Sequence, residues 1–148
     1  MDEIRTIVVA TDFSRNSARA LEQAIALGRR FGAALHLIHS YAIPMRGVMP
    51  YELAVPDSVW DGIREASEAK MLELREKVVA EGLEATTEVS PELPAEAVVA
   101  AALEREAQLI VMGTRGHTGL KHALLGSVAE RTIRTAPCSV LTVKDANE

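Results

Sequence analysis

Three glycines and one serine in the last third of the chain have the spacing of a phosphate-binding loop. Gly113 and Gly116 follow a short apolar run, and Gly126-Ser127 precedes a helical pattern. The N–H groups at the start of a helix lack intrahelical partners and carry the positive end of the helix dipole, which favours a bound anion. Glycine lets the backbone approach that anion without a Cβ atom. The pattern Gly-x2-Gly-x9-Gly-Ser therefore indicates a site for phosphate groups.

Several other phosphate and hydrolase motifs are excluded. Lys121 has neither the preceding glycine nor the following Ser or Thr that a P-loop requires. No Gly-x-Gly-x-x-Gly follows the first apolar run, and the Gly-x-Ser-x-Gly of a serine hydrolase is absent. Arg115 is a candidate for neutralising a polyphosphate, but the chain offers no recognisable general base or water-orienting residue. Any phosphohydrolase activity is expected to be slow.

Around this loop the hydrophobic pattern alternates between strand-like runs and helical repeats. We expect strands at 4–11, 34–40, 84–90, 108–112 and 138–143, and helices between Ser14 and Gly32, between Asp57 or Ser58 and Gly82, at 95–106 and at 127–135. Such alternation predicts one α/β domain, residues 1–148, with a parallel sheet and helices on both faces. The stretch 41–56 contains several prolines and no periodicity, and it is expected to form a long loop.

Polar residues follow two of the expected strands at their carboxyl ends. Ala10-Thr11-Asp12 ends the first strand, and Met112-Gly113 ends the fourth. If these strands are neighbours where the strand order reverses, their loops face the place where doubly wound sheets bind ligands. Asp12 then has two alternative roles. It stabilises a turn, or it binds a ligand, either a ribose hydroxyl directly or Mg²⁺ through water.

Composition narrows the class of protein. The 148 residues are 48% hydrophobic, which suits one globular domain and excludes disorder. A net charge of −5 argues against a nucleic-acid binder, and no apolar run has membrane-spanning length. Cys138 is the single cysteine, so an internal disulfide is excluded, and no histidines or carboxylates have the spacing of a protein-held metal site. The first residues lack the features of a signal peptide, and a cytoplasmic protein is expected.

These segments together resemble the universal stress protein family. The resemblance rests on Ala-Thr-Asp-Phe-Ser at 10–14, Leu-Ile-Val-Met-Gly at 109–113, the glycine pattern described above and Pro-Cys-Ser-Val-Leu-Thr-Val at 137–143. It extends from Ile4 to Val143. One departure is Gln108, where the family commonly has Asp; because this position precedes the strand, we expect no effect on the site.

The resemblance implies a fold, a ligand and an assembly. The fold is a three-layer doubly wound sheet of five parallel strands in the order 3-2-1-4-5, as in adenine-nucleotide α-hydrolases. Members with the complete glycine pattern bind ATP, and this chain keeps that pattern, so ATP is expected, with Mg²⁺. The family forms homodimers through the last strand, here Cys138 to Val143.

The resemblance also assigns roles to individual positions. Ala10, Thr11 and Asp12 line the adenine and ribose; Ile38 or His39 borders the base; Met112 and Gly113 flank the nucleoside; Arg115 and Gly116 lie toward the phosphates; and Gly126, Ser127 and Val128 hold the phosphates by backbone N–H groups and the Ser127 hydroxyl. Each position also has a plainer reading. Gly126-Ser127 is a common N-cap sequence, a loop arginine is usually solvated, and a histidine at a strand end is usually structural.

Three functions fit this sequence. The first is an ATP-binding stress-response module, a switch that orders its loops for a protein partner, with at most slow ATP hydrolysis. The second is a genuine but slow ATPase. The third is a nucleotide-free dimeric interaction module whose glycine loop is only architectural.

Overall fold

A parallel sheet forms the centre of the computed structural model, in which residues 3–42, 55–115 and 125–145 are described. Within these residues the order along the chain is β1 (Thr6–Ala10), α1 (Arg15–Phe31), β2 (Ala34–Ser40), α2 (Asp57–Ala80), β3 (Ala85–Ser90), α3 (Pro94–Glu104), β4 (Leu109–Gly113), α4 (Ser127–Thr135) and β5 (Ser139–Val143). The described part of the sheet has five strands in the order β3-β2-β1-β4-β5. Every neighbouring pair is parallel, which confirms the fold expected from the sequence.

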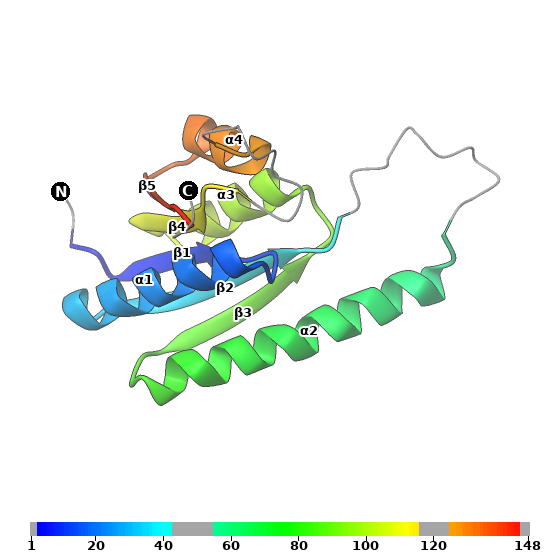
Figure 1. The fold of residues 1–148 in the computed structure, drawn as a ribbon, viewed down its shortest axis with the longest axis horizontal. Helices are drawn as coiled ribbons and strands as arrows, with labels where there is room; N and C mark the ends of the chain where they lie inside the picture. The colour runs from blue at the N-terminus through cyan, green and yellow to red at the C-terminus, as the bar shows by residue number, and fades with distance from the viewer. Residues whose placement is uncertain (1–2, 43–54, 116–124, 146–148) are drawn as a thin grey trace.

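Helices cover both faces of the sheet, giving three layers. Figure 1 shows α1 and α2 on one side of the strands and α3 and α4 on the other. Alternate residues of β1 divide between two apolar clusters, because successive side chains of a strand point to opposite faces. Ile7 and Val9 pack with α1 and α2, whereas Val8 packs with α3. β1 is therefore buried on both faces, as its nearly continuous apolar run predicts.

Helix α1 begins and ends at residues suited to those positions. Ser14 is its N-cap, and the Ser14 Oγ accepts a hydrogen bond from the Ser17 N–H. Gly32 ends it in the left-handed conformation with φ of 68°. Within the helix, a Cβ on Gly28 would lie 2.7 Å from Leu35 Cδ1. Glycine at this position therefore lets α1 approach β2 closely.

Two predictions about helix faces were wrong. Helical spacing predicts that Leu103 faces inward with Val98, Val99 and Ala102, but its side chain, one residue before the end of α3, is 60% exposed. The same spacing predicts that α2 buries an apolar stripe that begins at Trp60. Its buried residues begin only at Ser67, and Trp60 lies beside Tyr41 instead, with ring centroids 6.4 Å apart. No described helix combines the length and apolarity needed to cross a membrane.

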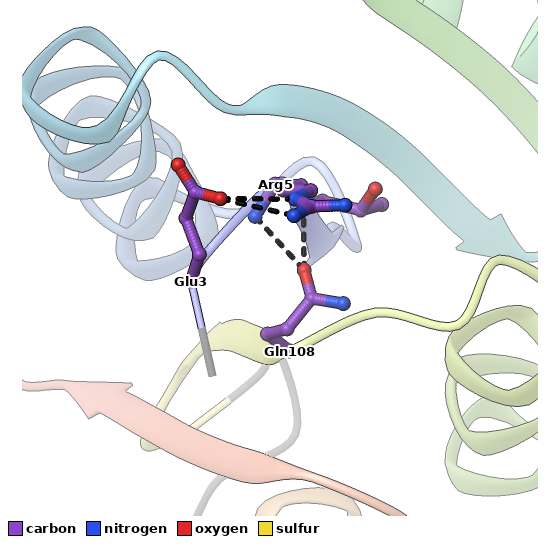
Figure 2. A network of polar contacts seen from close by, with 4 residues as sticks. Glu3, Arg5 and Gln108 are labelled. Atoms are coloured by element: carbon purple, nitrogen blue, oxygen red, sulfur yellow. Dashed lines mark hydrogen bonds and ion pairs between the residues drawn. The ribbon is translucent and has the colours of Figure 1, made fainter. Parts of the chain in front are cut away.

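A glutamine side chain ties together two strands at the amino edge of the sheet. Gln108 Oε1 accepts hydrogen bonds from the N–H groups of Arg5 and Thr6, at 2.9 and 3.0 Å. Figure 2 shows this contact, with Glu3 paired to the Arg5 guanidinium beside it. Gln108 thus joins the start of β1 to the start of β4. It lies at the opposite end of β4 from Gly113.

His36 on β2 is a buried histidine with a partner on each ring nitrogen. Its side chain is 1% exposed, and it contacts Thr86 Oγ1 at 2.7 Å and Glu88 Oε2 at 3.0 Å, both on β3. The sequence predicts only that His36 lies on a strand face, with no chemistry of its own. Burial lowers the pKa of His36 below the ordinary 6.5; the hydrogen bond to Glu88 opposes this shift, and the charge of Arg105 adds to it.

We predict that protein stability depends on pH through His36. The unfolded chain binds a proton at the ordinary histidine pKa of 6.5, whereas folded His36 binds it only at lower pH. The free energy of unfolding should therefore decrease as the pH falls from about 7.5 to about 5.5. Urea unfolding across this range measures the slope.

The variant His36→Gln cannot titrate and should show a shallower slope. A residual slope of the same sign is expected from His39, whose pKa burial also lowers. Equal slopes in the two proteins would contradict this account of His36.

Candidate functional site

The candidate site begins with the pairing of β1 and β4. Val9 lies opposite Val111, so Ala10 and Met112 follow next to each other at the carboxyl edge of the sheet. β1 leads through α1 to β2 on one side, and β4 leads through α4 to β5 on the other. The strand order therefore reverses between them, as the sequence suggested. In doubly wound sheets this is the position at which ligands bind.

Hydrogen bonds within the loop and to β2 hold the segment that follows β1. The Thr11 N–H donates to the Ile38 carbonyl on β2, at 2.9 Å. Asp12 Oδ1 accepts from the Ser14 N–H at 2.9 Å, and Thr11 Oγ1 accepts from the Phe13 N–H at 3.1 Å. Asp12 thus fills the turn role that the sequence allows, and Ser14 caps α1. The Asp12 carboxylate also lies at the carboxyl edge of the sheet, so its part in the turn is compatible with binding a ligand.

Phe13 adopts an uncommon backbone conformation, with φ of 63°. This left-handed region is unfavourable for a bulky residue, so its surroundings must hold it there. The Phe13 ring packs on His39 with centroids 4.2 Å apart, and Lys70 Nζ lies 5.1 Å from the Phe13 ring centre. Sequence analysis did not single out Phe13, because no pattern marks a positive φ at a phenylalanine.

His39 lies at the end of β2 and contacts the same loop. Its Nδ1 is 2.8 Å from the Thr11 carbonyl oxygen, and Nδ1–H is the donor because a carbonyl only accepts. Burial lowers the pKa of His39, although the Thr11 hydrogen bond and the charge of Asp12 act in the opposite direction. At neutral pH His39 is therefore uncharged. A neutral ring beside Thr11 suits a flat, uncharged group such as a base.

The start of α4 lies against the loop that follows β4. The Gly126 N–H donates to the Thr114 carbonyl at 2.6 Å, and a Cβ on Gly126 would lie 3.3 Å from that oxygen. The resemblance assigns the Gly126 N–H to phosphate, whereas in this structure it donates within the chain. Because α4 begins at Ser127, the donors at its N-terminus are the N–H groups of Ser127, Val128 and Ala129. The Ser127 side chain is exposed.

Asn16, in the first turn of α1, was missed by sequence analysis. Its Oδ1 accepts from the Arg115 N–H at 2.9 Å, and its Nδ2 donates to the Val143 carbonyl at 3.0 Å. The Thr114 N–H donates to the same carbonyl, at 3.1 Å. Asn16 therefore joins α1, the loop after β4 and the end of β5. The available signal was an amide in the first turn of α1, on the face that becomes apolar from Ala20 onward.

Most of the expected site residues meet at one edge of the sheet. Ala10, Thr11, Asp12, His39, Met112, Gly113, Arg115, Gly126, Ser127 and Val128 end or follow β1, β2 and β4 or begin α4. The side chain of Ile38 is 1% exposed and packs in the α3-side cluster, so only its carbonyl reaches the loop. Of the two residues expected to border the base, His39 is the one at the edge. Gly116, Lys121 and His122 lie outside the described residues.

The described part of the site offers backbone N–H groups as ligand partners. Among them, no three His, Cys, Asp or Glu side chains come together as metal ligands. Beside α4 lies a hollow of about 400 Å³ with Ser127 at its rim, where Arg131 and Arg134 pair with Glu96 and Glu130. With these guanidinium groups already paired, the helix N-terminus is the clearest anion partner on this side.

The comparisons with known proteins agree with this arrangement. A family model described as the universal stress protein family matches residues 3–144. Universal stress protein MJ0531 of Methanocaldococcus jannaschii is 40% identical over 144 residues, which are 95% of this chain and 82% of that protein. A universal stress protein of Thermus aquaticus is 36% identical over 147 residues, covering 95% of this chain and 98% of its own length.

Solved structures show the same fold. The structure of hypothetical protein MJ0577 superimposes with a TM-score of 0.86 at 26% identity, covering 99% of this chain and all (100%) of that one. A universal stress protein from Archaeoglobus fulgidus in complex with dAMP has a TM-score of 0.66 at 26% identity, with 97% and 100% of the two chains covered. A universal stress protein in complex with cAMP has a TM-score of 0.69 at 25% identity, with 96% and 98% covered. On its sequence match over residues 3–144 and its fold, this chain belongs to the universal stress protein family.

Proposed function

We propose that this protein binds ATP, with Mg²⁺, at the carboxyl edge of β1 and β4 and acts as a nucleotide-dependent switch in a stress response. The observation that carries the proposal is the meeting of three segments at this edge. Thr11 and Asp12 follow β1, Gly113 ends β4, and α4 begins beside Thr114. A cytoplasmic location belongs to the same proposal.

The proposed pose follows the chemistry of each segment. The adenine lies near Ala10 and the uncharged His39, and the ribose lies near Asp12, whose carboxylate suits a hydroxyl donor. The phosphates lie at the start of α4, where the N–H groups of Ser127 and Val128 meet the positive end of the helix dipole. Met112 and Gly113 flank the nucleoside, and Arg115 and Gly116 lie toward the phosphates.

Relatives support a nucleotide as the ligand. The complexes with dAMP and cAMP both contain an adenine, a ribose-type sugar and a phosphate. This chain has the complete pattern Gly113-x2-Gly116-x9-Gly126-Ser127, which the family resemblance links to ATP. A triphosphate also needs a counter-charge, and Mg²⁺ held by the phosphates, with Asp12 contributing through water, supplies it.

We favour switching over rapid catalysis because the two candidate bases at this edge, His39 and Asp12, already hold the loop after β1. His39 engages the Thr11 carbonyl through Nδ1, and the Asp12 carboxylate holds the turn. Nucleotide binding would instead shift the population of loop conformations that a protein partner meets.

A homodimer through β5 is part of the proposal. β5 is an edge strand of the sheet and pairs with β4 on one side. Exposed strand edges are templates for pairing with another chain. Leu141 on this strand is 38% exposed, so a second copy would cover an apolar side chain as well as backbone groups.

We predict that Gly126→Ala with Ser127→Ala weakens ATP binding by about 1–3 kcal/mol, because the Ser127 hydroxyl is lost and a methyl group at position 126 hinders the approach of the phosphates to the α4 N–H groups. Gly126 has φ of −70° and ψ of 163°, which suit alanine, and its Cβ would lie 3.3 Å from the Thr114 carbonyl oxygen, a contact that a shift of a few tenths of an ångström relieves, so the protein should stay folded. Isothermal titration of ATP in the presence of Mg²⁺ measures the loss.

The matched control is Gly62→Ala on α2, where a Cβ meets nothing within 4 Å. This variant should bind ATP as the unmodified protein does. If the unmodified protein fails to bind ATP, the nucleotide-free interaction module is the better account. ADP or AMP release as fast as ATP exchange would instead favour an enzyme.

We predict that Leu141→Lys converts the dimer to a monomer, because a charged side chain on an edge strand opposes pairing. Sedimentation equilibrium measures the mass of the assembly. Leu103→Lys is the control, since Leu103 is also exposed but lies on α3. A dimer that persists in Leu141→Lys, or an unmodified protein that is monomeric at all concentrations, would overturn the β5 interface.

A further inference from the structure

The amide of Asn16 is buried between the loop that follows β4 and the end of β5. Its side chain is 6% exposed, although it lies in the first turn of α1. Oδ1 must face the Arg115 N–H and Nδ2 must face the Val143 carbonyl, because the reverse orientation would set like groups against each other. Both ends of the amide are therefore used, and its orientation is determined.

Asn16 also explains why residue 113 is a glycine. A Cβ on Gly113 would lie 2.4 Å from Asn16 Oδ1 and 2.7 Å from Asn16 Cγ. Real Cβ atoms do not approach so closely, so the amide would have to leave its position. Gly113 does not need a positive φ, since the positive-φ glycines among the described residues are Gly32 and Gly82. Its role is thus to make room for Asn16.

We propose that Asn16 is the positioning residue of the phosphate-side loop, fixing Thr114 and Arg115 so that α4 begins at the correct place for a bound nucleotide. This inference rests on the proposed function. Asn16 does not need to touch the nucleotide; it acts through the backbone of Arg115, two residues beyond Gly113.

The contacts form a continuous path from Asn16 to α4. Asn16 holds the Arg115 N–H directly, and it shares the Val143 carbonyl with the Thr114 N–H. The Thr114 carbonyl in turn accepts from the Gly126 N–H, next to the first residue of α4. Without the amide, the hydrogen bond from the part-buried Arg115 N–H and one of the two hydrogen bonds to the Val143 carbonyl are lost, and Arg115 is held less firmly.

The first test compares two variants that lose similar contacts at opposite edges of the sheet. Asn16→Ala removes one bond from a backbone N–H and one to a backbone carbonyl, whereas Gln108→Ala removes two bonds from backbone N–H groups and one to the Glu106 carbonyl. Both should lower the melting temperature. Titration well below both melting temperatures should show ATP affinity reduced about tenfold or more by Asn16→Ala and unchanged by Gln108→Ala.

Equal affinities in the two variants would overturn the positioning role and leave Asn16 as a structural tie. Hydrogen exchange reports on the loop without any nucleotide. The Arg115 amide should exchange faster in Asn16→Ala than in Gln108→Ala, and equal exchange would also contradict the inference. An unmodified protein that does not bind ATP would overturn the proposed function and the nucleotide part of this inference, while the exchange result would still decide the loop part.

A double-mutant cycle tests the link between Asn16 and Gly113. Gly113→Ala should be strongly destabilising alone, because its Cβ displaces the Asn16 amide. In the Asn16→Ala background the amide is gone, so the same change should lower the melting temperature much less. Additive effects would show that Gly113 is required for a reason other than Asn16, and would overturn this explanation of the glycine.

Discussion

The pairing of β1 with β4 is the constraint on which the candidate site depends. The two strands are distant in the chain, and Val9 lies opposite Val111 in the middle of the sheet. β1 is buried on both faces, so its register with β4 cannot shift without moving its apolar side chains between two cores. Because the chain leaves the two strands on opposite sides, their following loops meet at one edge. The strand pairing itself therefore brings the Thr11 and Gly113 segments to the same edge.

Much of this arrangement could be predicted from residue types. The apolar runs predict the strands, Ser14 and Gly32 predict the ends of α1, and the polar character of 84–90 predicts an edge strand, which β3 is. The less predictable features depend on contacts between distant segments. No local pattern indicates that Asn16 reaches Val143, that Phe13 has a positive φ held by the His39 ring, or that His36 is buried between Thr86 and Glu88. Sequence periodicity indicates which face a residue is on, and the partner it meets there depends on the packing of the whole domain.

The glycine pattern, which first indicated a phosphate site, has more than one physical origin. At Gly113 the absent Cβ leaves space for the Asn16 amide. At Gly126 it lets the chain pass close to Thr114, and the N–H that was expected to face phosphate donates to that residue's carbonyl. Both glycines therefore build the loop, and the donors for an anion begin one residue later, at Ser127. A spacing motif of this kind records packing requirements as well as the ligand contacts that the family resemblance implies.

The most direct test of the central claim is a map of backbone amide chemical shifts during titration with Mg²⁺ and ATP. The account predicts saturable shifts confined to the carboxyl edge, at Thr11 to Phe13, Gly113 to Arg115 and Ser127 to Ala129, with none at Arg5, Thr6 or Gln108. Shifts concentrated at the amino edge or on the outer faces of the helices, or no saturable shift at any nucleotide concentration, would contradict it.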